Sequence, residues 1–344
     1  MATKSRIDYE LNRFEYIRDC LSRYKEECGD RLLESKNLLG EDLWLIDPHT
    51  HSTFSDGRGT VSQNYDVAMA CGLDFVYITD HHTIEQSKYA KMVEGISWGQ
   101  EPVAGREHIV LLNGGEVFVP QTQDPAELYK QACKIAPFVF FPHLGGQGIP
   151  INDIEERIET LKSVGPRFAM EIMNGIFNVF RSWDECDQTA VEMWDKLLQS
   201  GRQVTPVGAS DAHEPFGIGT VFTGVFAPEL SQSKLIESLV AGNCFVSEAA
   251  MLQFKCNDVP MGGVHESFPG KKLKFQIKAS DICGLRRLRV VSDGHVIKQY
   301  DIDGDCFMDE EFTFYSGKKS SYYRLEVVSQ DDRRAFSAPI YTQL

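Results

Sequence analysis

The sequence lacks Cys-x-x-Cys pairs, internal repeats, low-complexity segments and any apolar run long enough to span a membrane. Its nine cysteines are scattered along the chain, a pattern that favours reduced thiols, several of them in the core. The first residues, MATKSRIDYELNRF, contain no apolar run of the kind found in signal peptides. We therefore expect a cytoplasmic protein with no membrane partner.

The sequence also has fewer basic than acidic residues. Lys and Arg number 35 against 50 Asp and Glu, which gives a formal net charge of -15. This balance argues against a nucleic-acid backbone or an anionic membrane as the main partner. It still allows a local cationic site, because bound multivalent metal ions can invert the sign of one pocket. The apolar content of 42% and the charged content of 25% are those of an ordinary globular protein.

Three regions differ in their patterns, and we place them at 1–40, 41–247 and 248–344. In the first region, apolar residues recur at helical spacing and predict a helix over residues 6–35. We expect this helix to dock on the domain that follows it. A homodimer contact is the alternative.

The second region alternates short apolar runs with amphipathic stretches of helix length. The helical stretches lie at 125–135, 152–163 and 187–200. The expected strands lie at 43–46, 74–79, 109–117, 138–142, 168–173, 203–210 and 220–227. This alternation predicts parallel strands with crossover helices, and seven strands suit a closed or nearly closed (β/α) barrel better than a small open sheet.

The third region changes to alternating polar and apolar residues separated by Asp, Gly and Ser turns. SDGH at residues 292–295 is typical of a tight hairpin turn. We expect a small all-β sandwich domain here.

Polar residues that can bind metal ions follow the expected barrel strands. In a parallel barrel these strand ends share one face, so residues far apart in sequence would converge on one mouth. They are His49, His51, Asp80, His81, Glu116, His143, Glu171, Asn174, Asp211 and His213.

Imidazoles and carboxylates together are typical ligands of zinc, manganese and iron. The His-x-His step of His49 and His51 on extended backbone sends both rings to the same side. A single histidine at a strand end is more often structural than a ligand. The ordered set of His-x-His with a following Asp56, then Asp-His, Glu, His and Asp-x-His, predicts a metal site.

These motifs resemble those of the PHP (polymerase and histidinol phosphatase) family, whose barrel holds up to three metal ions. The motifs that carry the resemblance are DPHTHSTFSDG, YITDHH, LNGGEVFV, FFPHLGG, MEIMNG and VGASDAH, between residues 47 and 245. The C-terminal region is similar to that of the two-domain members often grouped as carbaryl-hydrolase-like metallohydrolases. The resemblance implies a distorted seven-stranded (β/α) barrel followed by the β-sandwich.

The resemblance also implies three ion sites. The second site would share Glu116 as a bridge with the first and would add His143. Family members commonly supply one more histidine between these two positions, and this chain has none there. The first site would use His49, His51, Glu116 and Asp211, and the third would use Asp56, His81 and His213.

A metal-dependent phosphoesterase is the leading hypothesis, with a hydroxide that bridges two ions attacking a small phosphomonoester or phosphodiester. Asp211 or His82 would handle the proton, although for His82 we favour a role as a residue that supports a ligand by a hydrogen bond. Arg58, Asn174 and Arg181 are the candidate substrate-binding residues.

Two other functions stay open. The same metal site would hydrolyse a carboxylic ester, carbamate or amide, or the chain would be a metal-binding scaffold without turnover. The identity of the substrate depends on the geometry of the loops at 83–107, 118–126 and 174–186. Their residues form no motif that identifies a substrate. We expect the protein to bind two or three divalent ions (zinc, manganese or iron) and to have a small phosphorylated molecule as its partner.

Overall fold

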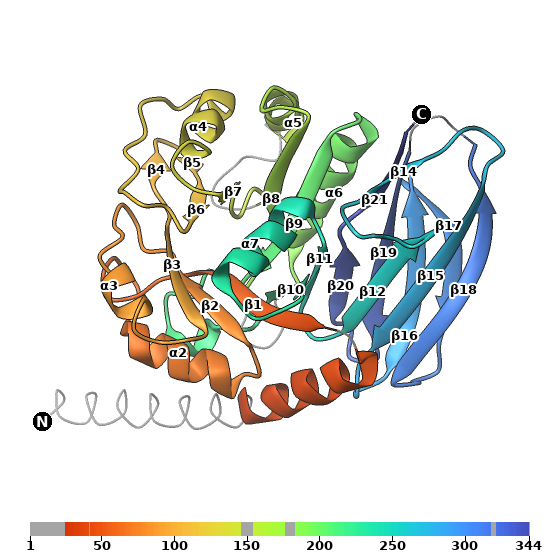
Figure 1. The fold of residues 1–344 in the computed structure, drawn as a ribbon, viewed down its shortest axis with the longest axis horizontal. Coiled ribbons are helices and arrows are strands. Elements are labelled where there is room, and N and C mark those ends of the chain that lie inside the picture. The colour runs from red at the N-terminus through yellow and green to blue at the C-terminus, as the bar shows by residue number, and fades with distance from the viewer. Residues whose placement is uncertain (1–24, 41, 146–153, 176–182, 318–320, 344) are drawn as a thin grey trace, which may run out of the picture.

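A computed structural model describes residues 25–40, 42–145, 154–175, 183–317 and 321–343 (Figure 1). The expected N-terminal helix is present over residues 25–39, and its earlier part lies outside the described residues. Its buried Arg31 pairs with Asp281 of the C-terminal region, whereas Lys36 pairs with Asp74 in the second region. The helix therefore contacts both large parts of the chain.

Most strands of the second region belong to one sheet, in the order β7-β6-β3-β2-β1-β10-β11. Strand β1 pairs in parallel with β2, and β2 pairs in parallel with β3. The bounds are β1 Leu43–Thr50, β2 Phe75–Ile78, β3 Ile96–Gln100, β6 Val110–Leu112, β7 Phe138–Phe140, β10 Phe222–Phe226 and β11 Cys244–Ser247.

The expectation that all these strands are parallel is wrong. Strands β3 and β6 are antiparallel, as are β6 and β7, and β10 runs antiparallel to β1. The chain between β3 and β6 holds only a short hairpin, β4 Val103–Ala104 and β5 Glu107–His108. A parallel pair needs a crossover of a dozen or more residues, which this segment does not provide.

A second, parallel ladder joins β8 (Arg167–Asn174) to β9 (Gln203–Ala209). Single bridges connect it to the main sheet on both sides, at Phe141–Met170 and Thr50–Ala212. The broad expectation of a mixed α/β region is confirmed, although the ladders between the described residues do not close it into a barrel.

The helices of this region begin where the sequence offers capping side chains. Thr60 caps α2 and Asp184 caps α6, each in a reciprocal capping box, and Asp124 caps α4. The three helices expected from periodicity are α4, α5 and α6. The helices are α2 Val61–Ala70, α3 Ser87–Ala90, α4 Pro125–Ala132, α5 Ile154–Lys162, α6 Glu185–Gln199 and α7 Gln232–Ala241, with a 3₁₀ turn at Pro215–Gly217.

The C-terminal region is rich in strands, as expected (Figure 1). One sheet has the order β13-β12-β15-β18, and it packs on the other through rings such as Phe275 and Tyr323, whose centroids are 4.9 Å apart. The hairpin at 292–295 is present, with Ser292 paired to His295. The strands are β12 Met251–Cys256, β13 Val259–Pro260, β14 Val264–Glu266, β15 Lys272–Ser280, β16 Leu285–Ser292, β17 His295–Asp301, β18 Phe307–Tyr315, β19 Ser321–Ser329, β20 Arg334–Ser337 and β21 Ile340–Gln343.

Strand β20 pairs with β11, so the sheet of the second region continues into the C-terminal region. The eight cysteines of the described segments are free thiols. Among the helices that the structure describes, none has the length and apolar character needed to cross a membrane.

Candidate metal centre

The ends of several strands bring imidazoles and carboxylates into three adjoining groups. Within each group the nitrogen and oxygen atoms lie no more than 4.8 Å from one another. The contributing strands are β1, β2, β3, β5, β7 and β9, some of which are far apart in sequence. The groups are His49, His51, Glu101 and Asp211; Glu101, His108 and His143; and His51, Asp56, His81 and His213.

The first group is buried throughout. His49 Nε2 lies 3.2 Å from Glu101 Oε2, and His51 Nε2 lies 3.1 Å from Asp211 Oδ1. The two Nε2 atoms are 3.2 Å apart. Four ligand atoms that face one another at these distances form the donor set that a divalent transition-metal ion takes in proteins.

The second group centres on the other oxygen of Glu101. His108 Nδ1 lies 2.8 Å and His143 Nε2 lies 2.9 Å from Glu101 Oε1. Glu101 therefore directs one carboxylate oxygen to each of the two groups. This is the arrangement of a carboxylate that bridges neighbouring cations.

The third group lies nearer the surface, and the side chain of Asp56 is 55% exposed. The Nδ1 atoms of His81 and His213 each lie 2.9 Å from a backbone carbonyl, of Glu101 and Asp211 respectively. Nε2 of each ring faces Asp56 Oδ2. A proton on Nδ1, donated to the carbonyl, leaves the lone pair of Nε2 available to a cation. The backbone thus orients both rings as ligands.

Glu116, the expected bridging carboxylate, lies outside the three groups and is exposed. Its backbone carbonyl accepts a hydrogen bond from Gln100 Nε2. The reversal of β6 explains the correction: the end of this strand points away from the edge at which β1, β2 and β3 end. Glu101, which directly follows β3, stands where Glu116 was expected.

His108 supplies the histidine that the sequence did not offer between residues 116 and 143. It ends β5, just before β6, and the reversed direction of β6 places the start of that strand at the edge where the three groups lie. Two features of the sequence could have identified Glu101 and His108. The short run ISWGQ is followed by an acid, and His108 precedes the apolar run IVLL.

The electrostatics of the groups are those of a site that attracts cations. Burial alone lowers the pKa of His49, but Asp211 and Glu101 outweigh it and raise this pKa well above the ordinary value. Burial also opposes the shift at His51, where the neighbouring carboxylates of Asp211 and Glu101 raise the pKa to about 9. Conversely, burial would raise the pKa of Asp211, and His49 and His51 hold it low. Protons therefore compensate the carboxylates when no ion is bound.

Two buried ligand atoms support the fit of a metal. His51 Nδ1 and Asp211 Oδ1 have no hydrogen-bond partner among the residues that the structure describes. A buried polar atom without a partner costs about 1–3 kcal/mol, so such atoms mark places where an ion or water completes the structure. The donor set and these two atoms fit divalent cations.

Buried carboxylates support the ligands from behind. Glu171 Oε1 lies 3.4 Å from His49 Nδ1, and its Oε2 accepts a 2.6 Å hydrogen bond from the His143 backbone N–H. Asp47 accepts backbone N–H groups from Ser210 and Gly219, and burial raises its pKa to about 6. These contacts fix the ligand-bearing strand ends relative to one another.

The remaining predicted residues have different surroundings. His82 is exposed, with its ring centroid 6.4 Å from that of His81. The side chain of Arg58 is 79% exposed and pairs with Glu214 at 2.7 Å. Asn174 donates from Nδ2 to Glu171 and to Asp211. Arg181 lies outside the described residues.

His82, His143 and Asp211 adopt left-handed backbone conformations, with φ of 53°, 33° and 49°. Such conformations in residues other than glycine cluster at functional sites, where the surrounding structure holds them.

Comparison with known proteins adds a family match. The model of a family described as PHP-associated matches residues 200–244, which include Asp211 and His213. The resemblance to PHP proteins is confirmed. The narrower grouping with carbaryl hydrolases stays a prediction. No curated protein matches the chain.

Solved structures of PHP-like proteins are among those that resemble this chain. A two-domain protein from Bacteroides vulgatus, containing a predicted PHP-like metal-dependent phosphoesterase, is 16% identical with a TM-score of 0.46, covering 88% of this chain and 95% of that one. PsfC from Pseudomonas syringae is 16% identical with a TM-score of 0.41, and the match covers 58% of this chain and 88% of PsfC. A lesion-specific endonuclease from Pyrococcus furiosus is 15% identical with a TM-score of 0.43, and the match covers 57% of this chain and 56% of the endonuclease.

Proposed function

We propose that the chain is a metal-dependent hydrolase, a phosphoesterase that cleaves a small phosphomonoester or phosphodiester. The sharing of Glu101 between two ligand groups carries this proposal. Shared ligands make the groups parts of one multi-ion centre, and clustered divalent ions suit a reaction in which negative charge builds up on several oxygens.

Bound divalent ions would lower the pKa of a water molecule and neutralise the charge of the phosphoryl oxygens. The ligands we propose are His49, His51, Glu101, Asp211, His108, His143, Asp56, His81 and His213. Imidazole and carboxylate donors are compatible with zinc, manganese or iron.

The protein's own residues would orient the reactants. Glu171 holds the His49 ring with Nε2 toward the first group. Asp211 is held ionised by the histidines around it, which suits a ligand better than a proton donor. We therefore assign the transfer of a proton to the leaving group to His82, which is exposed beside His81.

Arg58 and Asn174 are our candidates for binding the substrate, together with Arg181. The exposed guanidinium of Arg58 can exchange Glu214 for an anionic substrate, because both ends of this ion pair reach solvent. We further propose that the strand ends form the mouth of a distorted barrel, with the β-sandwich beside it.

Elemental analysis and three parallel assays test this function. Protein purified with zinc or manganese should retain at least two ions per chain and hydrolyse p-nitrophenyl phosphate or bis-p-nitrophenyl phosphate. Cleavage of p-nitrophenyl acetate alone would replace the phosphoesterase with an ester hydrolase. Bound metal without turnover of any of the three would support the scaffold.

A pair of variants separates the two glutamates. Glu101→Gln should lose metal and activity, because the amide supplies a weaker, neutral ligand to two groups at once. Glu116→Gln is the matched control, since this side chain is exposed outside the groups. Equal metal content in both variants would refute the assignment of Glu101.

A further inference from the structure

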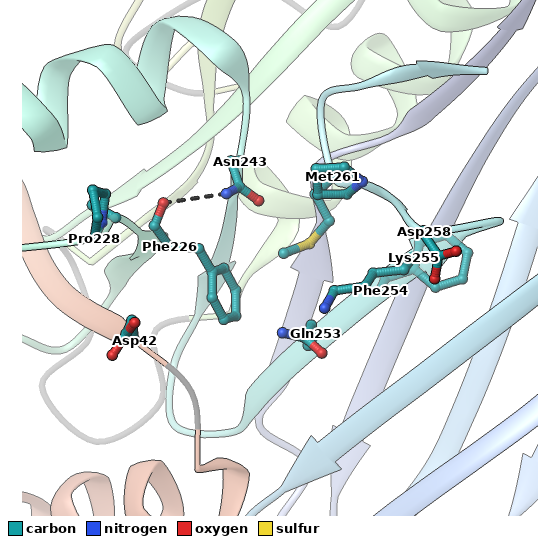
Figure 2. Close-up of a pocket in the computed structure, with 11 residues that line it drawn as sticks. Asp42, Phe226, Pro228, Asn243, Gln253, Phe254, Lys255, Asp258 and Met261 are labelled. Carbon is teal, nitrogen blue, oxygen red and sulfur yellow. Dashed lines mark hydrogen bonds between the residues drawn. The ribbon is translucent and has the colours of Figure 1, made fainter.

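A cavity of about 380 Å³ lies where the second region meets the C-terminal strands (Figure 2). Its lining includes Asp42, which precedes β1, and Phe226 at the end of β10. The metal-binding residues His49 and His51 lie at the other end of β1. At about 3.3 Å per residue, the length of this strand separates cavity and metal centre by roughly 20 Å.

The chemistry of the cavity centres on Gln253 and Lys255 of β12. The side chain of Gln253 is buried, with 8% of the residue exposed, yet its carboxamide makes no hydrogen bond within the described segments. Its amide nitrogen and oxygen are not among the described buried atoms that lack a partner, so they reach the solvent-accessible space of the cavity. Lys255 is half-buried and has no ion pair with any residue that the structure describes.

Figure 2 shows the side chains of Gln253 and Lys255 extending into the same space, beside the ring of Phe226 and the thioether of Met261. Asn243 closes another side, and its Nδ2 is already used by the carbonyl of Phe226. The cavity thus offers an ammonium and an amide as hydrogen-bond donors next to an apolar wall. The volume lies within the range of small-molecule sites.

We propose that this cavity binds a small monocarboxylic acid with a compact apolar body. The carboxylate would accept hydrogen bonds from Lys255 Nζ and Gln253 Nε2, and the apolar body would pack on Phe226 and Met261. Two carboxylates, Asp42 and Asp258, also line the cavity. They weaken the binding of any anion, and of a doubly charged group more than of a single carboxylate, so we propose a monocarboxylate and not a phosphate-bearing molecule.

Titration of the metal-loaded, full-length protein with phenylacetate tests the proposal, with binding followed by ligand-observed NMR. Saturable binding is expected, and 2-phenylethanol, which lacks the carboxylate, should bind at least about tenfold more weakly. Lys255→Met and Gln253→Leu should each weaken phenylacetate binding by about tenfold. Lys272→Met, at an exposed lysine on the neighbouring strand β15, is the matched control and should bind as the unmodified protein does.

Carboxylates also bind to metal ions, so the metal centre needs its own control. His49→Ala should retain phenylacetate binding if the acid occupies the cavity. Loss of binding in His49→Ala with full binding in Lys255→Met would overturn the proposal, as would the absence of saturable binding in the unmodified protein. Lys255 is partly exposed, so its variant keeps the test valid even if Gln253→Leu does not fold.

Discussion

The Nδ1 atom of His49 lies 3.4 Å from Oε1 of Glu171, and both side chains are buried. A carboxylate behind a ligating imidazole fixes the tautomer and the direction of the ring. The other oxygen of Glu171 accepts the backbone N–H of His143, where the backbone is left-handed. One carboxylate therefore positions a ligand in each of two groups.

Replacing this carboxylate should weaken metal binding without removing a ligand. In Glu171→Gln we expect a loss of metal affinity of about 10–100-fold. Competition with a chromophoric chelator would measure it. Glu156→Gln, on the exposed face of α5, is the matched control. Unchanged affinity in Glu171→Gln would show that the ring of His49 is held by its surroundings alone.

Asp80 should control the third group selectively. It is fully buried and accepts hydrogen bonds from the backbone N–H and the hydroxyl of Ser52 and from the hydroxyl of Ser55, next to Asp56. In Asp80→Asn one oxygen becomes a donor, so the loop that carries Asp56 loses part of its anchoring. We expect the metal content to fall by one ion per chain while the first two groups stay filled. Elemental analysis would measure this, and loss of all ions would contradict the selective role.

Metal binding should release protons near neutral pH. The pKa of His51 is about 9 and that of His49 is also raised, so both rings are protonated in the metal-free protein at pH 7. An ion must displace these protons, and its affinity should therefore rise with pH up to about 9. Calorimetric titration with Zn²⁺ in two buffers of different ionisation enthalpy would count the released protons. Equal heats in both buffers would contradict this account.

The sequence predicts the parts of this centre that depend on local patterns. Asp211 and His213 follow a strand whose direction agrees with β1, so counting strand ends places them correctly. Glu116 fails because the direction of β6 is set by pairing with β3 and not by its own residues. Glu101 and His108 border short elements whose composition resembles that of a loop. The direction of a strand is set by tertiary pairing, so the local pattern of its own residues does not reveal it.

Arg31 should link the N-terminal helix to the C-terminal strands. It is buried and forms a bidentate ion pair with the fully buried Asp281, and it also contacts Asp331. Arg31→Met leaves a buried carboxylate without its partner, which costs about 3–5 kcal/mol of unfolding free energy. Urea denaturation would measure the loss. Arg286→Met removes an exposed pair with Asp332 and should cost no more than about 1 kcal/mol. Similar losses in both variants would show that burial of the pair is irrelevant.

Asp187 should make stability fall as the pH rises. Burial raises its pKa from 3.8 to about 8, although backbone N–H groups of Asn174 and Asp184 oppose the shift. Between these two values the folded chain holds a proton at Asp187 that the unfolded chain releases. The free energy of unfolding therefore decreases with increasing pH across that window.

In Asp187→Asn this contribution disappears, because the amide does not titrate. We expect the variant to be less stable than the unmodified protein near pH 5, where it lacks one acceptor for the backbone, and the difference to shrink toward pH 8 and above. Urea denaturation of both proteins at a series of pH values would measure the two slopes. Parallel slopes would mean that Asp187 ionises in the folded protein as it does in water, and that the N–H groups of Asn174 and Asp184 compensate fully for its burial.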